Sequence, residues 1–325
     1  MTGDSIPTSD RPPVVVITGP TASGKSGLAL LLAEAVGGVV INADSMQVYR
    51  ELAVLTARPG AEALTRAPHR LYGVLPGSER CSAGRWRKMA LEEIAACHAA
   101  GQVPLVVGGT GLYLRALERG LAKVPEIAPE IRQAARARHR DLGGAVFHAE
   151  LAVRDPVMAA RLSPGDSQRL IRAWEVVEAT GRSLAAWQAE EGAEPPAPYR
   201  FLRITCQPPR EELYAACNAR FAAMAEGGAL EEVRALLALA LDPSLPIMKA
   251  LGVPELAAHL AGEFTLDQAV FRAQQATRNY AKRQMTWLRT QGAKDRSGEA
   301  IQIAQYLESL EPKIFTIIRH FLLTG

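Results

Sequence analysis

The sequence is poor in the residues that form disulfide bonds and metal sites. Among its 325 residues there are four cysteines and six histidines. The cysteines lie far apart without a C-x-x-C pair, and they are Cys81, Cys97, Cys206 and Cys217. This spacing is typical of the reduced thiols of a cytosolic protein, so neither a disulfide framework nor a zinc site is expected.

The sequence also lacks a long apolar run and a strong net charge. No stretch is long enough to span a membrane as a helix, and the polar leader MTGDSIPTSDRPP has no apolar core of a signal peptide. We therefore expect a cytoplasmic protein without membrane contacts. The net charge of +3 by itself indicates no class of partner, so the local clusters of basic residues are more informative.

Apolar strands and helices alternate through the first third of the chain. VVVIT at residues 14–18 and GVVINADS at 38–45 are expected strands, and the helix between them spans residues 26–36. Another helix begins after Ser82 and ends at Gly101, before a third strand, a Gly-Gly turn and a helix within VPLVVGGTGLYLRAL. Continuous apolar strands between helices predict an α/β fold, in which helices cover both faces of a parallel sheet.

The segment GPTASGKS joins the first strand to the first helix and matches G-x-x-x-x-G-K-[ST] in full. Backbone N–H groups in such a loop bind oxyanions. Lys25 adds a positive charge, and the Ser26 hydroxyl suits a Mg2+ ion that bridges two phosphate oxygens. The core is therefore predicted to be P-loop NTPase-like, although the pattern leaves open whether a phosphate is transferred. The predicted ligands of a diphosphate or triphosphate are Gly19, Pro20, Thr21, Ala22, Ser23, Gly24, Lys25 and Ser26.

The character of the sequence changes beyond residue 122. Helical segments rich in alanine and arginine follow, and then the linker AEEGAEPPAPY and the expected strand YRFLRITCQP, which returns to the sheet. We predict an α/β core interrupted by a helical insertion. The predicted parts are the first part of the core at residues 12–122, the insertion at 123–195, the second part of the core with a basic C-terminal helix at 196–291, and a variable tail at 292–325.

Two side chains at predicted strand ends are candidates for chemistry, because ligands of a doubly wound sheet bind outside the carboxyl ends of the strands. Asp44 follows the second strand, where it can serve a metal ion, act as a general base, or simply cap the next turn. Thr110 stands among Gly108, Gly109 and Gly111, which let a substrate approach the backbone closely. Its hydroxyl can bond that substrate or cap the following helix.

Two regions are rich in basic residues. The segment FRAQQATRNYAKRQMTWLRT contains no acidic residue. On a helix its Arg278, Lys282 and Arg289 fall within about 40° of one another, which fits either a phosphodiester backbone or a solvated helix face. In the insertion, Gln168 and Arg172 share a helix face and can contact base edges or phosphates. The insertion also has a basic cluster made of Arg132, Arg136, Arg138, His139 and Arg140.

Eight stretches follow one another between residues 13 and 290: GPTASGKS, INADSMQVYREL, TARP, APHRLYG, VPLVVGGTGLYLRAL, DSQRLIRAWEV, TGRSL and TRNYAKRQMTWLR. Together they resemble the tRNA dimethylallyltransferase (isopentenyl-tRNA transferase) family. Many proteins share the phosphate loop, whereas the Asp-Ser pair after the second strand, GGTGLY and AKRQMTWLR are specific in combination.

The resemblance implies a prenyltransferase that moves a dimethylallyl group from dimethylallyl diphosphate to the N6 amine of adenosine-37, next to the tRNA anticodon. The phosphate loop and Mg2+ would then hold the leaving diphosphate. The resemblance makes Asp44 the base, places Thr110 beside the reaction channel, and adds Lys25 and Arg220 to the catalytic residues as diphosphate ligands. The predicted tRNA contacts are Asp44, Ser45, Met46, Gln47, Thr110, Arg132, Gln168, Arg169, Leu170, Ile171, Arg172, Arg278, Lys282 and Arg283.

The alternative is a P-loop kinase for a small molecule, whose lid arginines would lie within residues 132–140. A non-catalytic RNA-binding protein with a nucleotide-binding fold is a further alternative. Nucleotide hydrolysis or transfer distinguishes the kinase, because the transferase should show neither. Nothing in the chain demands a partner subunit, so a monomer is expected.

Overall fold

A computed structural model of the protein describes residues 11–189, 197–292, 299–304 and 311–324. Its contacts divide the chain into two compact units, of which one is Met1–Glu118 with Ala197–Gly325 and the other is Arg119–Pro196. No helix in the described ranges is both long enough and apolar enough to cross a bilayer.

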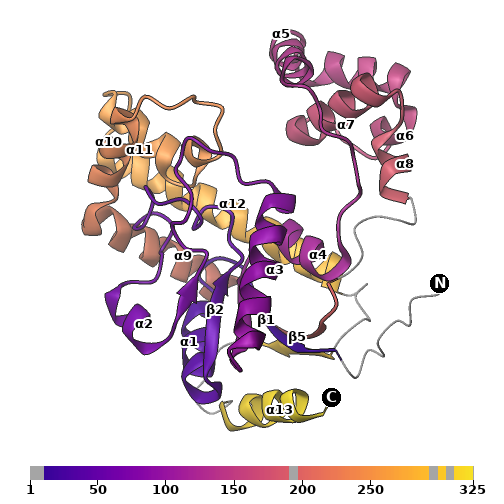
Figure 1. The fold of residues 1–325 in the computed structure, drawn as a ribbon. Helices are drawn as coiled ribbons and strands as arrows, with labels where there is room; N and C mark the ends of the chain where they lie inside the picture. The colour runs from indigo at the N-terminus through magenta and orange to yellow at the C-terminus, as the bar shows by residue number, and fades with distance from the viewer. Residues whose placement is uncertain (1–10, 190–196, 293–298, 305–310, 325) are drawn as a thin grey trace, which may run out of the picture. The chain divides into compact units, whose positions relative to one another are not determined.

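The first unit is built on a six-stranded sheet in the order β3-β2-β4-β1-β5-β6, and every pair of neighbours is parallel. Figure 1 labels β1, β2 and β5 of this sheet. The strands are β1 (Pro13–Thr18), β2 (Gly38–Asn42), β3 (His69–Arg70), β4 (Val103–Gly108), β5 (Arg200–Cys206) and β6 (Glu299–Ile303). The parallel α/β sheet expected from the sequence is confirmed. Because all strands run the same way, the segments that leave β1, β2 and β4 emerge at one edge.

Helices cover both faces of this sheet, and the central strand shows why. Val14 and Val16 of β1 belong to one apolar cluster, whereas Val15 and Ile17 belong to another. The first cluster includes residues of α3 (Ala83–Ala99), α9 (Arg210–Met224), α10 (Leu230–Ala238), α11 (Val253–Leu260) and α12 (Leu266–Gly292). The second includes residues of α1 (Lys25–Val36) and α13 (Glu311–Leu323). A strand buried on both faces requires a continuous apolar run, as β1 has.

The last part of the chain completes this unit. The sequence indicated only a variable tail at 292–325, but β6 extends the sheet beside β5, and α13 packs Ile314 and Ile318 into the second cluster. The expected strand at 38–45 is shorter than predicted, because β2 ends at Asn42 and leaves Asp44 outside the sheet.

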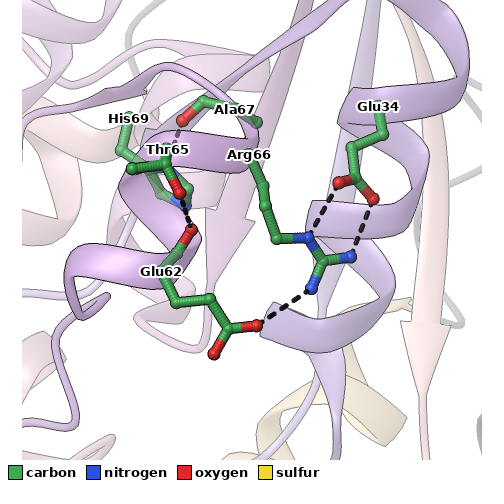
Figure 2. A network of polar contacts seen from close by, with 6 residues as sticks. All are labelled: Glu34, Glu62, Thr65, Arg66, Ala67 and His69. Carbon is green, nitrogen blue, oxygen red and sulfur yellow. Dashed lines mark hydrogen bonds and ion pairs between the residues drawn. The ribbon is translucent and has the colours of Figure 1, made fainter.

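A polar network joins the short helix α2 (Ala61–Arg66) to α1 (Figure 2). Arg66 donates from Nε and Nη2 to the two carboxylate oxygens of Glu34, both at 2.8 Å, and lies 3.7 Å from Glu62. The hydrogen bond from Arg66 lowers the pKa of Glu34. Because the network is exposed to solvent, it orients α2 ahead of the edge strand β3 more than it stabilises the fold.

The second unit is helical and has a core of its own. Its helices are α5 (Pro129–Arg154), α6 (Pro156–Ala159), α7 (Ser167–Thr180) and α8 (Leu184–Ala189). Phe147, Leu151, Leu170 and Trp174 are buried in one apolar cluster. Helix α5 is interrupted at Gly143, whose φ of 72° and ψ of 165° are not helical. Glycine reaches this region of φ without steric strain, so the helix can change direction there.

Candidate active site

The phosphate loop adopts a tight turn between β1 and α1. Gly24 has a φ of 81° in the left-handed region, which favours glycine. A side chain at Gly19 would place its Cβ 2.6 Å from the carbonyl oxygen of Cys206, so β5 leaves no space for one. Lys25 Nζ donates to the carbonyl oxygen of Pro20 at 3.2 Å and folds back over the loop, while Ser26 is exposed at the start of α1.

The structure brings Lys25, Asp44 and Arg220 together. Burial lowers the pKa of Lys25, the charge of Asp44 raises it, and the charge of Arg220 lowers it again. Burial also lowers the pKa of Arg220, which donates a hydrogen bond to the Thr21 hydroxyl of the phosphate loop. Two cations that share one acid in a buried position form a site with spare positive charge, which a diphosphate would neutralise.

Asp44 both caps a turn and lines a cavity. Its Oδ1 accepts from the backbone N–H of Met46 at 2.8 Å, and its own backbone is held by the Asn42 amide, with bonds of 2.8 and 3.1 Å. The capping role that the sequence left open is therefore real, and it engages one carboxylate oxygen. The side chain still faces the cavity that Thr21 and Arg220 also line.

Thr110 uses its side chain at the strand ends. Thr110 Oγ1 accepts from the backbone N–H of Ser45 at 3.0 Å, whereas its carbonyl oxygen accepts from the N–H of Tyr113 in α4 (Gly111–Arg119). The hydroxyl therefore joins the ends of β2 and β4 instead of capping α4. A side chain at Gly108 would lie 2.2 Å from the carbonyl oxygen of Ala43, so this close approach requires glycine.

Gln284 of α12 ties the phosphate loop to the turn after β4. Its Oε1 accepts from the backbone N–H of Thr21 at 2.8 Å, and its Nε2 donates to the carbonyl oxygen of Gly109 at 2.9 Å. The Gln284 side chain is 7% exposed. Sequence analysis missed this residue, because a glutamine on a basic helix carries no local signal of burial. Gln284 therefore fixes the distance between the turn after β4 and the phosphate loop, whose Thr21 lines the cavity.

Gln284→Leu should lower the melting temperature and weaken the binding of inorganic diphosphate. The change removes the partner of two partly buried backbone groups, and an unpaired group costs up to about 1–3 kcal/mol when it is fully buried. Thermal unfolding and calorimetric titration with diphosphate measure both effects. Gln275→Leu, an exposed position on the same helix, is the matched control. A Gln284 variant that behaves like this control would contradict the bridging role.

The cavity has a volume of about 260 Å³. Its lining includes the polar residues Thr21, Asp44 and Arg220 and the apolar residues Phe221 and Met224. Burial raises the pKa of Tyr280, and the negative charge of Asp44 raises it further. A hydrogen bond with the Thr110 side chain acts in the opposite direction. The complete lining is Thr21, Asp44, Ser45, Met46, Leu55, Thr56, Cys217, Arg220, Phe221, Met224, Lys249, Ala250, Leu251, Thr277, Tyr280 and Arg283.

The basic residues of α12 separate into different environments. Arg278 is half-buried and donates hydrogen bonds to the side chains of Asn218 and Gln275. Arg283 lines the cavity and lies 5.6 Å from the centre of the Tyr280 ring. Lys282 and Arg289 are exposed. We call Arg278, Lys282 and Arg289 the α12 stripe. One of its three residues, Arg278, already bonds a side chain of α9.

The remaining candidates lie in the helical unit. Arg132 lies near the start of α5, and residues 168–172 form the first turns of α7. Gln168 and Arg169 are exposed, and Ile171 is half-buried. Arg172 pairs with Glu175 at 3.4 Å. Leu170 is fully buried in the core of the unit, so its side chain is not available at the surface.

A strand–loop–helix of the type that binds oxyanions, with an acid and two cations beside it, makes the first unit a P-loop α/β protein with a candidate active-site cavity. The chain matches the family model described as IPP transferase over residues 47–291 and the one described as isopentenyl transferase over residues 12–74. It belongs to the IPP transferase family. The resemblance found in the motifs is confirmed.

Similar proteins with known names agree. A tRNA dimethylallyltransferase of Rhodospirillum centenum is 62% identical over 279 residues, which cover 86% of this chain and 89% of the relative. The solved structure of the full-length tRNA isopentenylpyrophosphate transferase of Bacillus halodurans is 29% identical, with a TM-score of 0.67 and coverage of 96% of this chain and 97% of the other. A eukaryotic dimethylallyltransferase acting on tRNA is 25% identical, with a TM-score of 0.79 and coverage of 96% and 79%. The predicted P-loop NTPase-like fold agrees with these neighbours.

Proposed function

We propose that the protein transfers a dimethylallyl group from dimethylallyl diphosphate to the N6 amine of adenosine-37 in tRNA, beside the anticodon. The observation that carries this proposal is the cavity in which the phosphate loop, Asp44 and Arg220 meet an apolar wall. We assign the diphosphate to the polar and cationic residues of the lining and the allyl group to its apolar residues. The names of the relatives supply the tRNA and the alkyl group.

The reaction follows from these placements. The bond between the allylic carbon and the diphosphate oxygen breaks, and the bond between that carbon and N6 of the adenine forms. Negative charge that develops on the diphosphate is stabilised by the N–H groups of the loop, by Lys25 and by Arg220. Asp44 accepts the proton that N6 loses. Thr110 holds the backbone N–H of Ser45 and so fixes the segment that begins with Asp44.

We propose that Mg2+ would be held by one protein hydroxyl together with the substrate. The described residues contain no group of three or more histidine, cysteine or acidic side chains that could hold a metal ion. The exposed Ser26 hydroxyl at the phosphate loop is the protein ligand that we assign to Mg2+, with phosphate oxygens and water completing its shell. The ion would neutralise charge on the leaving diphosphate.

The tRNA must present an unstacked adenine to this cavity, as base-modifying enzymes require. We infer that Ser45, Met46 and Gln47 contact the anticodon loop together with Arg283, and that the helical unit binds the anticodon stem-loop. The protein would act in the cytoplasm, where its substrate is found, and as a monomer, because one chain supplies every residue assigned to the site.

Incubation with unmodified tRNA, Mg2+ and dimethylallyl diphosphate labelled in the allyl group tests the proposal. Label in the tRNA is the expected result, and digestion to nucleosides should locate it on N6 of a single adenosine. A parallel reaction contains labelled ATP, from which no phosphate should be released or transferred. Transfer of phosphate from ATP without alkylation of the tRNA would overturn the proposal and favour the kinase.

Lys282→Gln and Arg289→Gln should reduce the salt dependence of tRNA binding. Each exposed cation that contacts a phosphate contributes about one unit to the slope of log K against log salt concentration. Binding titrations at several salt concentrations measure the slope. Lys88→Gln, which removes an exposed charge from α3, should leave the slope unchanged. If all three variants keep the wild-type slope, the α12 stripe is only a solvated face.

A further inference from the structure

The residues of helix α9 that line the cavity change from cationic to apolar along the helix. Its cavity residues Cys217, Arg220, Phe221 and Met224 lie three, four and seven positions apart and therefore share one face. Cys217 Sγ lies 3.8 Å from the carbonyl oxygen of Thr21, and Arg220 bonds the hydroxyl of the same residue. Met224 lies seven residues beyond Cys217, which corresponds to about 10 Å along the helix axis. The end of the cavity at Met224 is thus the end away from the phosphate loop.

Leu55 forms part of the wall of this apolar end. It lines the cavity and is only 8% exposed. A Cβ built on Gly252 would lie 2.8 Å from Leu55 Cδ2 and 2.8 Å from Phe221 Cε2. Leu55 and Phe221 therefore both pack so closely on Gly252 that a methyl group added there would collide with them. An alkyl chain directed toward Leu55 meets this packed wall.

Glu232 holds the backbone at Leu55 in place. Its Oε1 accepts from the backbone N–H groups of Ala53 at 2.5 Å and Val54 at 2.8 Å, and its Oε2 accepts from that of Leu55 at 2.9 Å. Hydrogen bonds to a charged acceptor are stronger than neutral ones, and three consecutive N–H groups make an anion-binding concavity. The carboxylate therefore holds the backbone of Leu55 from α10, across the interior of the unit.

A second contact fixes the loop on its other side. Gln47 Nε2 donates to the carbonyl oxygen of Thr56 at 2.8 Å and to that of Ala57 at 3.1 Å. The backbone around Leu55 is thus held by the Glu232 carboxylate on one side and by the Gln47 amide on the other. The Leu55 side chain belongs to the same apolar cluster as Phe221. Interiors with this packing do not absorb extra methylene groups without strain.

We propose that Leu55, held in place by Glu232, sets the size of the alkyl group that the enzyme transfers. The cavity admits a dimethylallyl group and excludes the longer geranyl group, because Leu55 closes the apolar end. The inference rests on the proposed transferase activity. It assigns a specificity role to Leu55 and a positioning role to Glu232.

The test compares kcat/KM for dimethylallyl diphosphate and geranyl diphosphate with the same unmodified tRNA. Leu55→Ala should raise the ratio of geranyl to dimethylallyl transfer by about tenfold or more, the scale on which an apolar pocket discriminates by size. Val54→Ala is the matched control, since it lies in the same clamped loop but does not line the cavity. Its ratio should equal that of the wild type.

Glu232→Gln should raise the same ratio to a smaller extent, because the amide can accept fewer of the three N–H groups. When it is combined with Leu55→Ala, the ratio should rise no further than in Leu55→Ala alone, since both changes act on one wall. Melting temperatures of all variants separate this effect from general destabilisation. A role of Glu232 in stability alone would lower the melting temperature and leave the ratio unchanged.

If Leu55→Ala does not fold, Leu55→Val provides the same comparison with a smaller expected rise. A folded Leu55 variant that transfers dimethylallyl groups with the wild-type ratio overturns the proposal. Failure of the wild-type protein to alkylate tRNA with either diphosphate would instead overturn the proposed function. The two failures are therefore distinguishable.

Discussion

Asp44→Asn should abolish alkyl transfer to tRNA while tRNA affinity stays within a few-fold of the wild type. The expected loss in kcat is about 10²–10⁴-fold, the usual contribution of a positioned general base. Asparagine retains an oxygen that can accept from the N–H of Met46, so the turn after β2 should survive. It cannot accept the proton that leaves N6, because an amide is not a base at neutral pH.

Single-turnover transfer with preformed enzyme–tRNA complex measures the chemical step separately from binding. Asp267→Asn, an acid in the first turn of α12 and outside the cavity, is the matched control and should retain full activity. Thermal unfolding should give a similar melting temperature for Asp44→Asn and the wild type. If Asp44→Asn transfers the alkyl group normally, Asp44 is not the base and only caps the turn.

Local sequence patterns were sufficient for the phosphate loop and for Asp44. The loop motif determines its own conformation through Gly24 and its neighbours, and an acid just beyond a buried strand must emerge at the edge of the sheet. Arg220 was assigned only through the family resemblance, because its meeting with Thr21 depends on how α9 packs. Local patterns therefore predicted where the acid and the anion-binding loop lie, whereas the role of Asp44 as a base and the place of Arg220 came from the resemblance.

Contacts between distant segments account for what the sequence left unpredicted. Gln284 bonds Thr21 and Gly109, and Glu232 bonds Leu55, across large separations in the chain. In the sequence, neither residue can be told apart from the exposed glutamines and glutamates around it. Strand β6 was missed for a similar reason, since a short segment acquires strand structure by pairing with β5. Burial and pairing are tertiary properties, and a single sequence does not reveal them.

The candidate site buries two cationic side chains, and burial disfavours their charged forms in the protein without ligand. Burial lowers the pKa of Lys25 and of Arg220, and Arg220 acts against the charged form of Lys25. We expect an anion to stabilise such a site when it binds. We therefore expect a change at Lys25 to alter the stability of the free protein, its dependence on pH and the activity.

Lys25→Met should decrease diphosphate binding and transfer by about 10²–10³-fold, the effect of losing one preorganised electrostatic contact. The same change should raise the melting temperature of the free protein near neutral pH. Methionine fills similar space without a charge, and the folded state disfavours the charged form of Lys25. Calorimetric titration with inorganic diphosphate and thermal unfolding without ligand measure the two opposite effects.

The pH dependence has a definite sign. Between the lowered pKa of folded Lys25 and the ordinary lysine pKa of about 10.4, the unfolded chain binds the proton and the folded chain does not. The wild type therefore gains stability as pH rises through this window, and its deficit relative to Lys25→Met should shrink. Wild-type affinity for diphosphate should fall over the same window, because the ammonium group is lost. Lys88→Met, which alters an exposed lysine, should show neither effect, and a Lys25→Met protein less stable than the wild type at neutral pH would contradict the buried-charge account.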